Sequence, residues 1–270
     1  MPRKIIILTL AILLTMNAKN LIARLRYYLH LTPKWDETRH ASCWDGTNAS
    51  RRMMNILSPF FSDGKFREYI KWMQSRDCDT AHVFLINGAD GEGGGYNCAT
   101  NADHAKLARR RIEKLRKKGF AVVVWLISDD SPAWARDLFA NAGERLQALD
   151  DARLFDEASY VVLGLEMNEK GSFPGWETGW SAVRAALGAV WHGKIGVHHK
   201  SGNDFPCAGL ADIVLGQLEP KNANPDSVAA QIAAIKSQGK IAVGFEYSRG
   251  ADRRLAQASL DAGAIGCGNW

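Results

Sequence analysis

Short apolar runs alternate with amphipathic helical patterns from about residue 40 to the end of the chain, and this alternation constrains the fold most. Residues 121–127 (AVVVWLI) are nearly all β-branched or aromatic, as in a strand buried on both faces. Similar runs predict eight strands, at residues 41–44, 81–86, 121–127, 160–171, 194–198, 211–218, 241–246 and 264–267. Such alternation predicts a parallel sheet with right-handed crossovers, and eight strands close into a (β/α)8 TIM barrel.

The helical patterns between these runs carry ordinary start and stop signals. Pro132 stands at a predicted first helical position, and Gly119 and Gly239 follow predicted helix ends. An open doubly wound sheet is the alternative, but it usually has fewer strands, and no GxGxxG follows the first strand here. We therefore expect a single barrel domain over residues 39–270.

Residues 1–38 are expected to be separate from the barrel. Arg3 and Lys4 precede an apolar run at residues 5–16, which fits a secretory signal and is short for a membrane span. Basic residues soon after it and a poor cleavage site argue against export, and the alternative is a helix that docks on the barrel, a membrane or a virion. Both alternatives stay open. If residues 1–18 act as a signal, the protein is secreted or virion-associated, and otherwise it is cytoplasmic.

The charge distribution argues against a nucleic-acid partner, and the cysteines argue against disulfides and a zinc site. Residues 1–39 account for the whole formal charge of +5, so the remainder is neutral. The basic run at residues 109–118 includes Glu113 and has no interleaved aromatic residues, which indicates a solvated helix face and no nucleic-acid partner. Five cysteines without a CxxC pair indicate neither disulfides nor zinc, and we expect no metal or other cofactor. Nothing indicates an oligomeric state.

Acidic and polar side chains follow the apolar runs, at the end of the strands where such barrels carry their sites. Glu166 ends the fourth run and Glu246 ends the seventh, so that the two would face each other across the barrel mouth. Aromatic and polar side chains near the same ends could bind substrate: Trp44, Asp45, Asp129, Asn168, His198, Tyr247 and Trp270.

Strand alternation favours Glu166 over Glu169 as the inward carboxylate, because residues two apart share a side. Three glycines precede polar residues by two positions: Gly164 before Glu166, Gly196 before His198 and Gly244 before Glu246. We expect these glycines in the crowded interior, so the three polar side chains should point inward. Glu169 would face outward unless the strand bulges.

An Asn-Glu pair ending the fourth strand, with a lone Glu ending the seventh, resembles the glycoside hydrolases of clan A, which include the family 5 cellulases. The resemblance implies that Glu169 is the acid/base, that Asn168 holds a sugar 2-hydroxyl and that Glu246 is the nucleophile. His198 and Trp270 are similar to a histidine and a tryptophan that line family 5 clefts. Strand alternation and resemblance thus select different acid/base residues, and both alternatives stay open.

The sequence departs from that family in two places. Lys170 follows the Asn-Glu pair where the family has proline or valine, and no arginine ends the second strand. Residues 44–59 are also similar to barrel proteins encoded by tailed phages and prophages.

The expected activity is cleavage of a polysaccharide by a retaining mechanism with two carboxyl groups about 5 Å apart. Two alternatives remain: a Schiff-base aldolase or lyase that uses Lys200, and a non-catalytic carbohydrate-binding or phage structural barrel.

Overall fold

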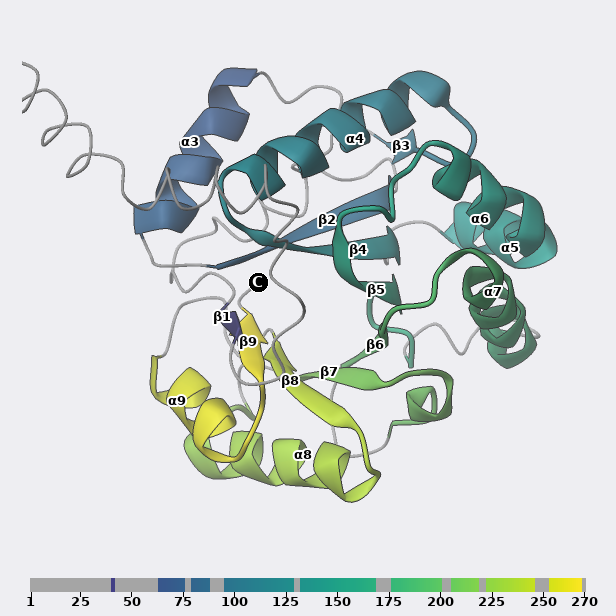
Figure 1. Ribbon diagram of the computed structural model, residues 1–270. Helices are drawn as coiled ribbons and strands as arrows, with labels where there is room; N and C mark the ends of the chain where they lie inside the picture. The colour runs from purple at the N-terminus through teal and green to yellow at the C-terminus, as the bar shows by residue number, and fades with distance from the viewer. Residues whose placement is uncertain are drawn as a thin grey trace, which may run out of the picture.

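The computed structural model describes residues 40–41, 63–75, 79–87, 95–128, 132–168, 176–200, 205–218, 222–245 and 253–268. These residues form a mixed α/β fold in which strands alternate with helices (Figure 1). The strands are β1 (His40–Ala41), β2 (Thr80–Asn87), β3 (Tyr96–Asn97), β4 (Ala121–Ile127), β5 (Ala158–Gly164), β6 (Ile195–Lys200), β7 (Ile213–Gln217), β8 (Ile241–Phe245) and β9 (Gly266–Gly268). The helices are α3 (Asp63–Ser75), α4 (Ala102–Lys117), α5 (Pro132–Ala140), α6 (Ala142–Asp151), α7 (Trp176–Val190), α8 (Pro225–Ser237), α9 (Arg253–Asp261) and the 3-10 helix η2 (Ala208–Leu210).

The strands form one curled sheet in the order β1-β9-β8-β7-β6-β5-β4-β2-β3. All neighbours are parallel except β3, which pairs antiparallel with β2. The predicted run of eight parallel strands is confirmed, and β3 is an addition within the glycine-rich loop that follows the second strand. Within the described residues no ladder joins β1 to β2, so the eight parallel strands form a half-barrel.

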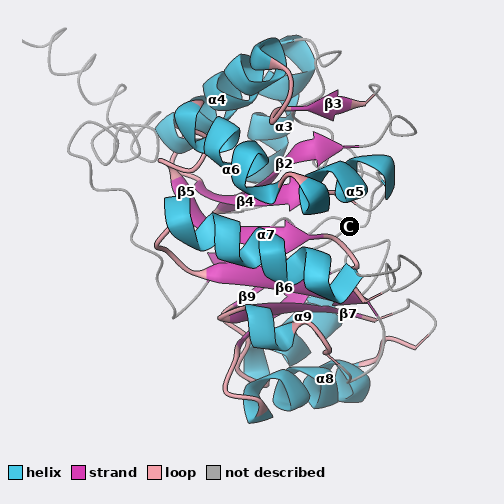
Figure 2. Ribbon diagram, turned by 90° about the vertical axis from the view of Figure 1, so that its right-hand side faces the viewer, coloured by secondary structure: helices cyan, strands magenta, loops and turns pink. Residues whose placement is uncertain are grey.

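The helices lie on the outside of this curled sheet (Figures 1 and 2). Three of them are followed by glycines in the left-handed region, Gly119 (φ 91°), Gly239 (φ 72°) and Gly263 (φ 95°), where a side chain would be strained. Between β6 and β7 the described residues form only the short η2.

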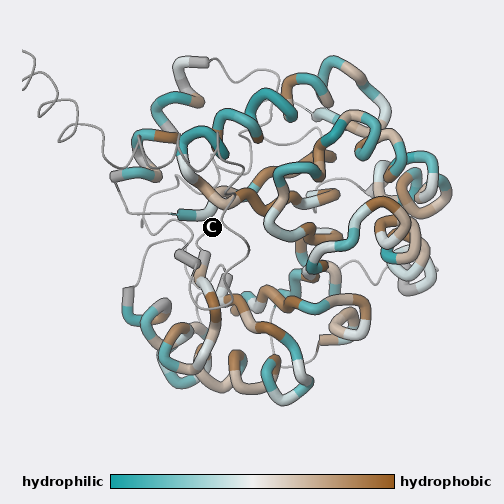
Figure 3. The backbone as a smooth tube through the Cα atoms, in the orientation of Figure 1, coloured by the Kyte–Doolittle hydropathy of each residue, from teal (hydrophilic) through white to brown (hydrophobic). Residues whose placement is uncertain are grey.

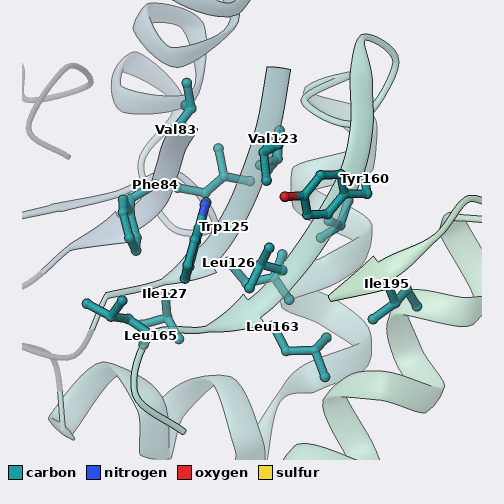
Figure 4. Close-up of a cluster of buried hydrophobic side chains, with 14 of the residues drawn as sticks. Val83, Phe84, Val123, Trp125, Leu126, Ile127, Tyr160, Leu163, Leu165 and Ile195 are labelled. Atoms are coloured by element: carbon teal, nitrogen blue, oxygen red, sulfur yellow. The ribbon is translucent and has the colours of Figure 1, made fainter. Parts of the chain in front are cut away.

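The hydrophobic core occupies both faces of the sheet, the inner side of the curl and the layer between the strands and the outer helices. Figure 3 shows mostly hydrophobic strands, whereas the outer helix α4 is mostly hydrophilic. All seven residues of β4 are buried, and the ring of Trp125 packs beside that of Phe84 of β2, with the centroids 5.1 Å apart (Figure 4). Full burial of such a side chain contributes about 1.5–3 kcal/mol.

The N-terminal segment at residues 1–38 lies outside the described residues. No helix of the described part combines the length and the apolar character needed to cross a membrane.

Candidate active site

The C-terminal ends of the parallel strands meet at one rim of the curled sheet, and the structure describes part of this rim. Glu166, Asn168, His198 and Lys200 are described, and they lie together where β5 and β6 end. The remaining candidates lie outside the described residues: Trp44, Asp45, Asp129, Glu169, Glu246, Tyr247 and Trp270.

The inner side of β6 carries His198, as the sequence predicted. A Cβ on Gly196, two residues earlier, would lie 3.1 Å from Val162 of β5 and 3.2 Å from Leu215 of β7, inside the curl. The ring of His198 is fully buried, and its centroid is 5.6 Å from that of Trp125 on β4. The imidazole therefore lies beneath the rim, against the core of the sheet.

His198 holds the turn that carries Glu166. The chain leaves β5 after Gly164, and the backbone N–H of Glu166 donates to His198 Nδ1 at 2.9 Å. The N–H of Met167 donates to the His198 carbonyl, also at 2.9 Å. Two hydrogen bonds to one residue thus fix the position of this turn.

The backbone of Glu166 is strained. Its φ of 47° lies in the left-handed region, which a long side chain rarely adopts. Such a conformation costs on the order of 1–3 kcal/mol and persists where the surroundings impose it, typically at functional sites. The hydrogen bond to His198 is one such constraint.

The Glu166 side chain extends to the neighbouring strand. Lys200 Nζ lies 3.3 Å from Glu166 Oε2, and the two side chains are 22% and 12% exposed. Lys200 is two residues beyond His198 on β6 and therefore shares its inner side. A carboxylate and an ammonium group thus lie together at the inner rim, with limited access to water.

Asn168 clamps the same turn to β6. Its Nδ2 donates to the Lys200 carbonyl at 2.6 Å, and its Oδ1 accepts from the Lys200 N–H at 2.8 Å. The amide thereby extends the pairing of β5 and β6 beyond the last backbone ladder. The resemblance gave this residue a sugar-binding role, whereas the geometry shows a structural one.

The environment keeps His198 neutral. Burial lowers its pKa well below the ordinary 6.5, and nearby His199, Lys200 and His82 lower it further. Because Nδ1 accepts a hydrogen bond, the proton of the neutral ring belongs on Nε2. His198 therefore positions the backbone of Glu166 without adding a charge.

The expected role of the strand glycines is correct only for Gly196 of β6. A Cβ on Gly164 would lie 2.6 Å from a ring carbon of Trp180, which belongs to the outer helix α7. This glycine therefore makes room for helix packing and does not relieve crowding inside the sheet.

Gly244 faces outward, contrary to the prediction. It is in register with Gly216, where a Cβ would lie 2.7 Å from Gln231 of the outer helix α8. The alternation within β8 therefore gives no support to an inward Glu246. The inward direction of Glu246 remains a prediction that depends on the resemblance.

Sequence reasoning missed Gln217, the last residue of β7. It is in register with Lys200 on β6 and is 7% exposed. The rule that selected Glu166, a polar side chain at the end of an apolar run, also applies to Gln217.

His199 lies on the opposite side of β6, in register with outward Gly216. Its ring stacks on Phe205 at a centroid distance of 5.6 Å, and burial lowers its pKa to about 4. The adjacent histidines thus cannot share a metal ion. In the described part of the chain, no cluster of three His, Cys, Asp or Glu side chains could hold one.

No protein-family model matches the sequence, and no curated protein matches it significantly.

Solved glycoside hydrolases share the fold. A family 5 glycoside hydrolase from Bacteroides vulgatus ATCC 8482 matches with a TM-score of 0.59 at 14% identity, over 85% of this chain and 57% of that chain. GH5_18 from Bifidobacterium longum subsp. longum ATCC 55813 matches with a TM-score of 0.62 at 12% identity, over 87% and 70%. A GH113 β-1,4-mannanase matches with a TM-score of 0.51 at 12% identity, over 87% of both chains.

These matches confirm, at the level of the fold, the predicted resemblance to glycoside hydrolases of clan A. The chain spans 50% to 57% of the length of three of the matching proteins. The predicted similarity to phage-encoded barrels gains no support from them.

Proposed function

We propose that the protein is a glycoside hydrolase with a closed (β/α)8 barrel, which cleaves a polysaccharide or oligosaccharide by a retaining two-carboxylate mechanism. The observation that carries the proposal is Glu166, a carboxylate at the inner rim on strained backbone that His198 holds. The similarity of the fold to glycoside hydrolases supports the class of reaction.

In this mechanism Glu166 is the acid/base and Glu246 the nucleophile. The Glu246 carboxylate attacks the anomeric carbon while Glu166 gives its proton to the departing glycosidic oxygen, and a glycosyl-enzyme ester forms. Glu166 then takes a proton from water, which attacks the same carbon and releases the sugar and the free carboxylate. Glu169 is the alternative acid/base.

The proposed sugar contacts come from side chains near the same strand ends: Trp44, Asp45, Asp129, Tyr247 and Trp270. Aromatic rings among them could stack on the faces of sugar rings. Asn168 and His198 contribute by holding the turn that carries Glu166.

The ion pair at the rim does not favour the aldolase alternative. A Schiff-base lysine must attack as a neutral amine, whereas Lys200 is paired with the Glu166 carboxylate. In the hydrolase the ammonium group has to move away from Glu166 when this residue donates its proton. Hydroxyl groups of the bound sugar could replace it as hydrogen-bond partners.

The test compares Glu166→Gln, Glu169→Gln and Glu246→Gln with Glu144→Gln, which changes an exposed glutamate of α6. The substrates are mannohexaose, cellohexaose and the dinitrophenyl β-glycosides of mannose and glucose. We expect Glu166→Gln to lower kcat/KM on the cleaved hexasaccharide about 1,000-fold, since general acid catalysis contributes about 100- to 10,000-fold. Glu246→Gln should be inactive, and Glu144→Gln should match the wild type.

The dinitrophenyl glycosides distinguish the roles. Their leaving group needs no proton, so Glu166→Gln should still release a burst of dinitrophenol, and Glu246→Gln should not. If Glu169→Gln gives the burst and Glu166→Gln retains full activity, the acid/base is Glu169. Full activity in both variants contradicts the mechanism.

A further inference from the structure

The end of β7 places an amide side chain at the inner rim that no step of the proposed reaction uses. Gln217 pairs in register with Lys200 and so points to the inner side of the sheet, as Leu215 does two residues earlier. The residue is 7% exposed. Its Oε1 is buried and has no hydrogen-bond partner among the described residues.

The backbone of Gln217 is held from the outer side of the sheet. Gln231 of α8 donates from Nε2 to the Gln217 carbonyl at 2.9 Å. This approach requires Gly216, because a Cβ there would lie 2.7 Å from Gln231 Oε1. The strand end is thus fixed in place, while the amide itself is directed inward.

Lys200, the neighbour of Gln217 on β6, does not donate to this amide oxygen. Its Nζ lies 3.3 Å from Glu166 on the other side. A buried acceptor without a partner costs about 1–3 kcal/mol of stability, so its retention points to a ligand that supplies the donor.

We propose that Gln217 is a substrate-binding residue and that a sugar hydroxyl donates a hydrogen bond to its Oε1. A hydroxyl group can both donate and accept, as an amide can, so the two form a matched pair. Glu166, Lys200 and Gln217 then form a row across three adjacent strands that offers an acceptor, a donor and an amide. This assignment depends on the proposed function and specifies one contact of its substrate.

Calorimetric titration tests the contact in the slow Glu166→Gln background, with mannohexaose and cellohexaose as the probes. Gln217→Met is close in size and lacks the amide, and Gln217→Leu removes the same group with a different shape. Gln238→Met is the matched control, because Gln238 is exposed at the end of α8. We expect both Gln217 variants to bind the hexasaccharide about 5- to 10-fold more weakly, the loss of one neutral hydrogen bond, and the control to bind unchanged.

The melting temperature separates binding from packing. Removal of an unpaired buried amide should leave Tm unchanged or raise it, whereas loss of a structural amide would lower it. Unchanged affinity in both Gln217 variants overturns the assignment of Gln217, and so does a fall in Tm that accompanies the loss of binding in both. Neither result bears on the proposed function. If the Glu166→Gln parent binds neither probe and the wild type cleaves neither, the proposed function fails for these sugars, and the Gln217 contact fails with it.

Discussion

His198 and His199 are neighbours on β6 with the same burial and opposite surroundings. Both rings are fully buried and both have lowered pKa values. His198 accepts the N–H of Glu166 and packs beside Trp125 on the inner side of the sheet. His199 stacks on Phe205 on the outer side, and neither ring nitrogen has a hydrogen-bond partner in the described part of the chain.

The difference shows that burial alone does not mark a functional histidine. Burial lowers the pKa of both rings, but only His198 holds a candidate catalytic residue by a hydrogen bond. The unsatisfied ring of His199 is a cost without any contact to the rim. The inner histidine should therefore matter for activity, and the outer one chiefly for stability.

The largest expected difference is in catalysis. His198→Phe leaves the buried N–H of Glu166 without an acceptor, which costs about 1–3 kcal/mol and should lower kcat/KM on the cleaved hexasaccharide about 100-fold. His199→Phe keeps a ring on Phe205 and should change kcat/KM less than about threefold. His198→Asn should recover part of the activity, because its Oδ1 can accept the same N–H. Equal losses in the two phenylalanine variants would remove the distinction between the two histidines.

A smaller effect should appear in acid stability. The folded pKa of His199, about 4, lies below the ordinary 6.5, so the unfolded chain takes up the proton first as the pH falls. The stability that the neutral ring contributes is complete above about pH 6.5 and is lost as the pH falls towards about 4. His198 and His82 act in the same direction.

In this pH range each such histidine adds about 1.4 kcal/mol per pH unit to the slope of the unfolding free energy. His199→Phe should lower this slope by the contribution of one histidine, while the phenylalanine ring keeps the stacking on Phe205. Urea unfolding at several pH values between about 4 and 7 measures the slope. The same slope in the variant as in the wild type would mean that His199 is already charged in the folded protein.

The smallest expected effect concerns the strain that His198 helps to impose. At a φ of 47°, glycine avoids the steric cost of a Cβ, so Glu166→Gly should be about 1 kcal/mol more stable than Glu166→Ala. Both variants lose the ion pair with Lys200, so the comparison isolates the backbone term. Chemical denaturation of the pair measures the difference. An alanine variant as stable as the glycine variant would show that the turn is relaxed.

Much of the framework could be predicted from local pattern. The seven-residue apolar run of β4 can be buried only between two layers, and Gly119 and Gly239 could be expected after helix ends. The parallel sheet also predicted that Glu166 would lie close to the polar residues that end the neighbouring strand, His198 and Lys200. Glycine was the weak signal, because an absent side chain can make room on either face of a strand. Gly164 makes room for Trp180 of the outer helix α7 and Gly244 is in register with outward Gly216, neither of which strand alternation revealed.

The sequence by itself determined the order of strands and helices, the parallel sheet and the polar residues that end the strands, since these depend on periodicity and composition. Only the tertiary structure decided which polar groups meet. The ion pair of Glu166 with Lys200, the clamp by Asn168 and the inward amide of Gln217 depend on the register between β5, β6 and β7. Register between strands is a long-range property: a shift by one residue would exchange the faces of His198 and His199 with no change in the sequence.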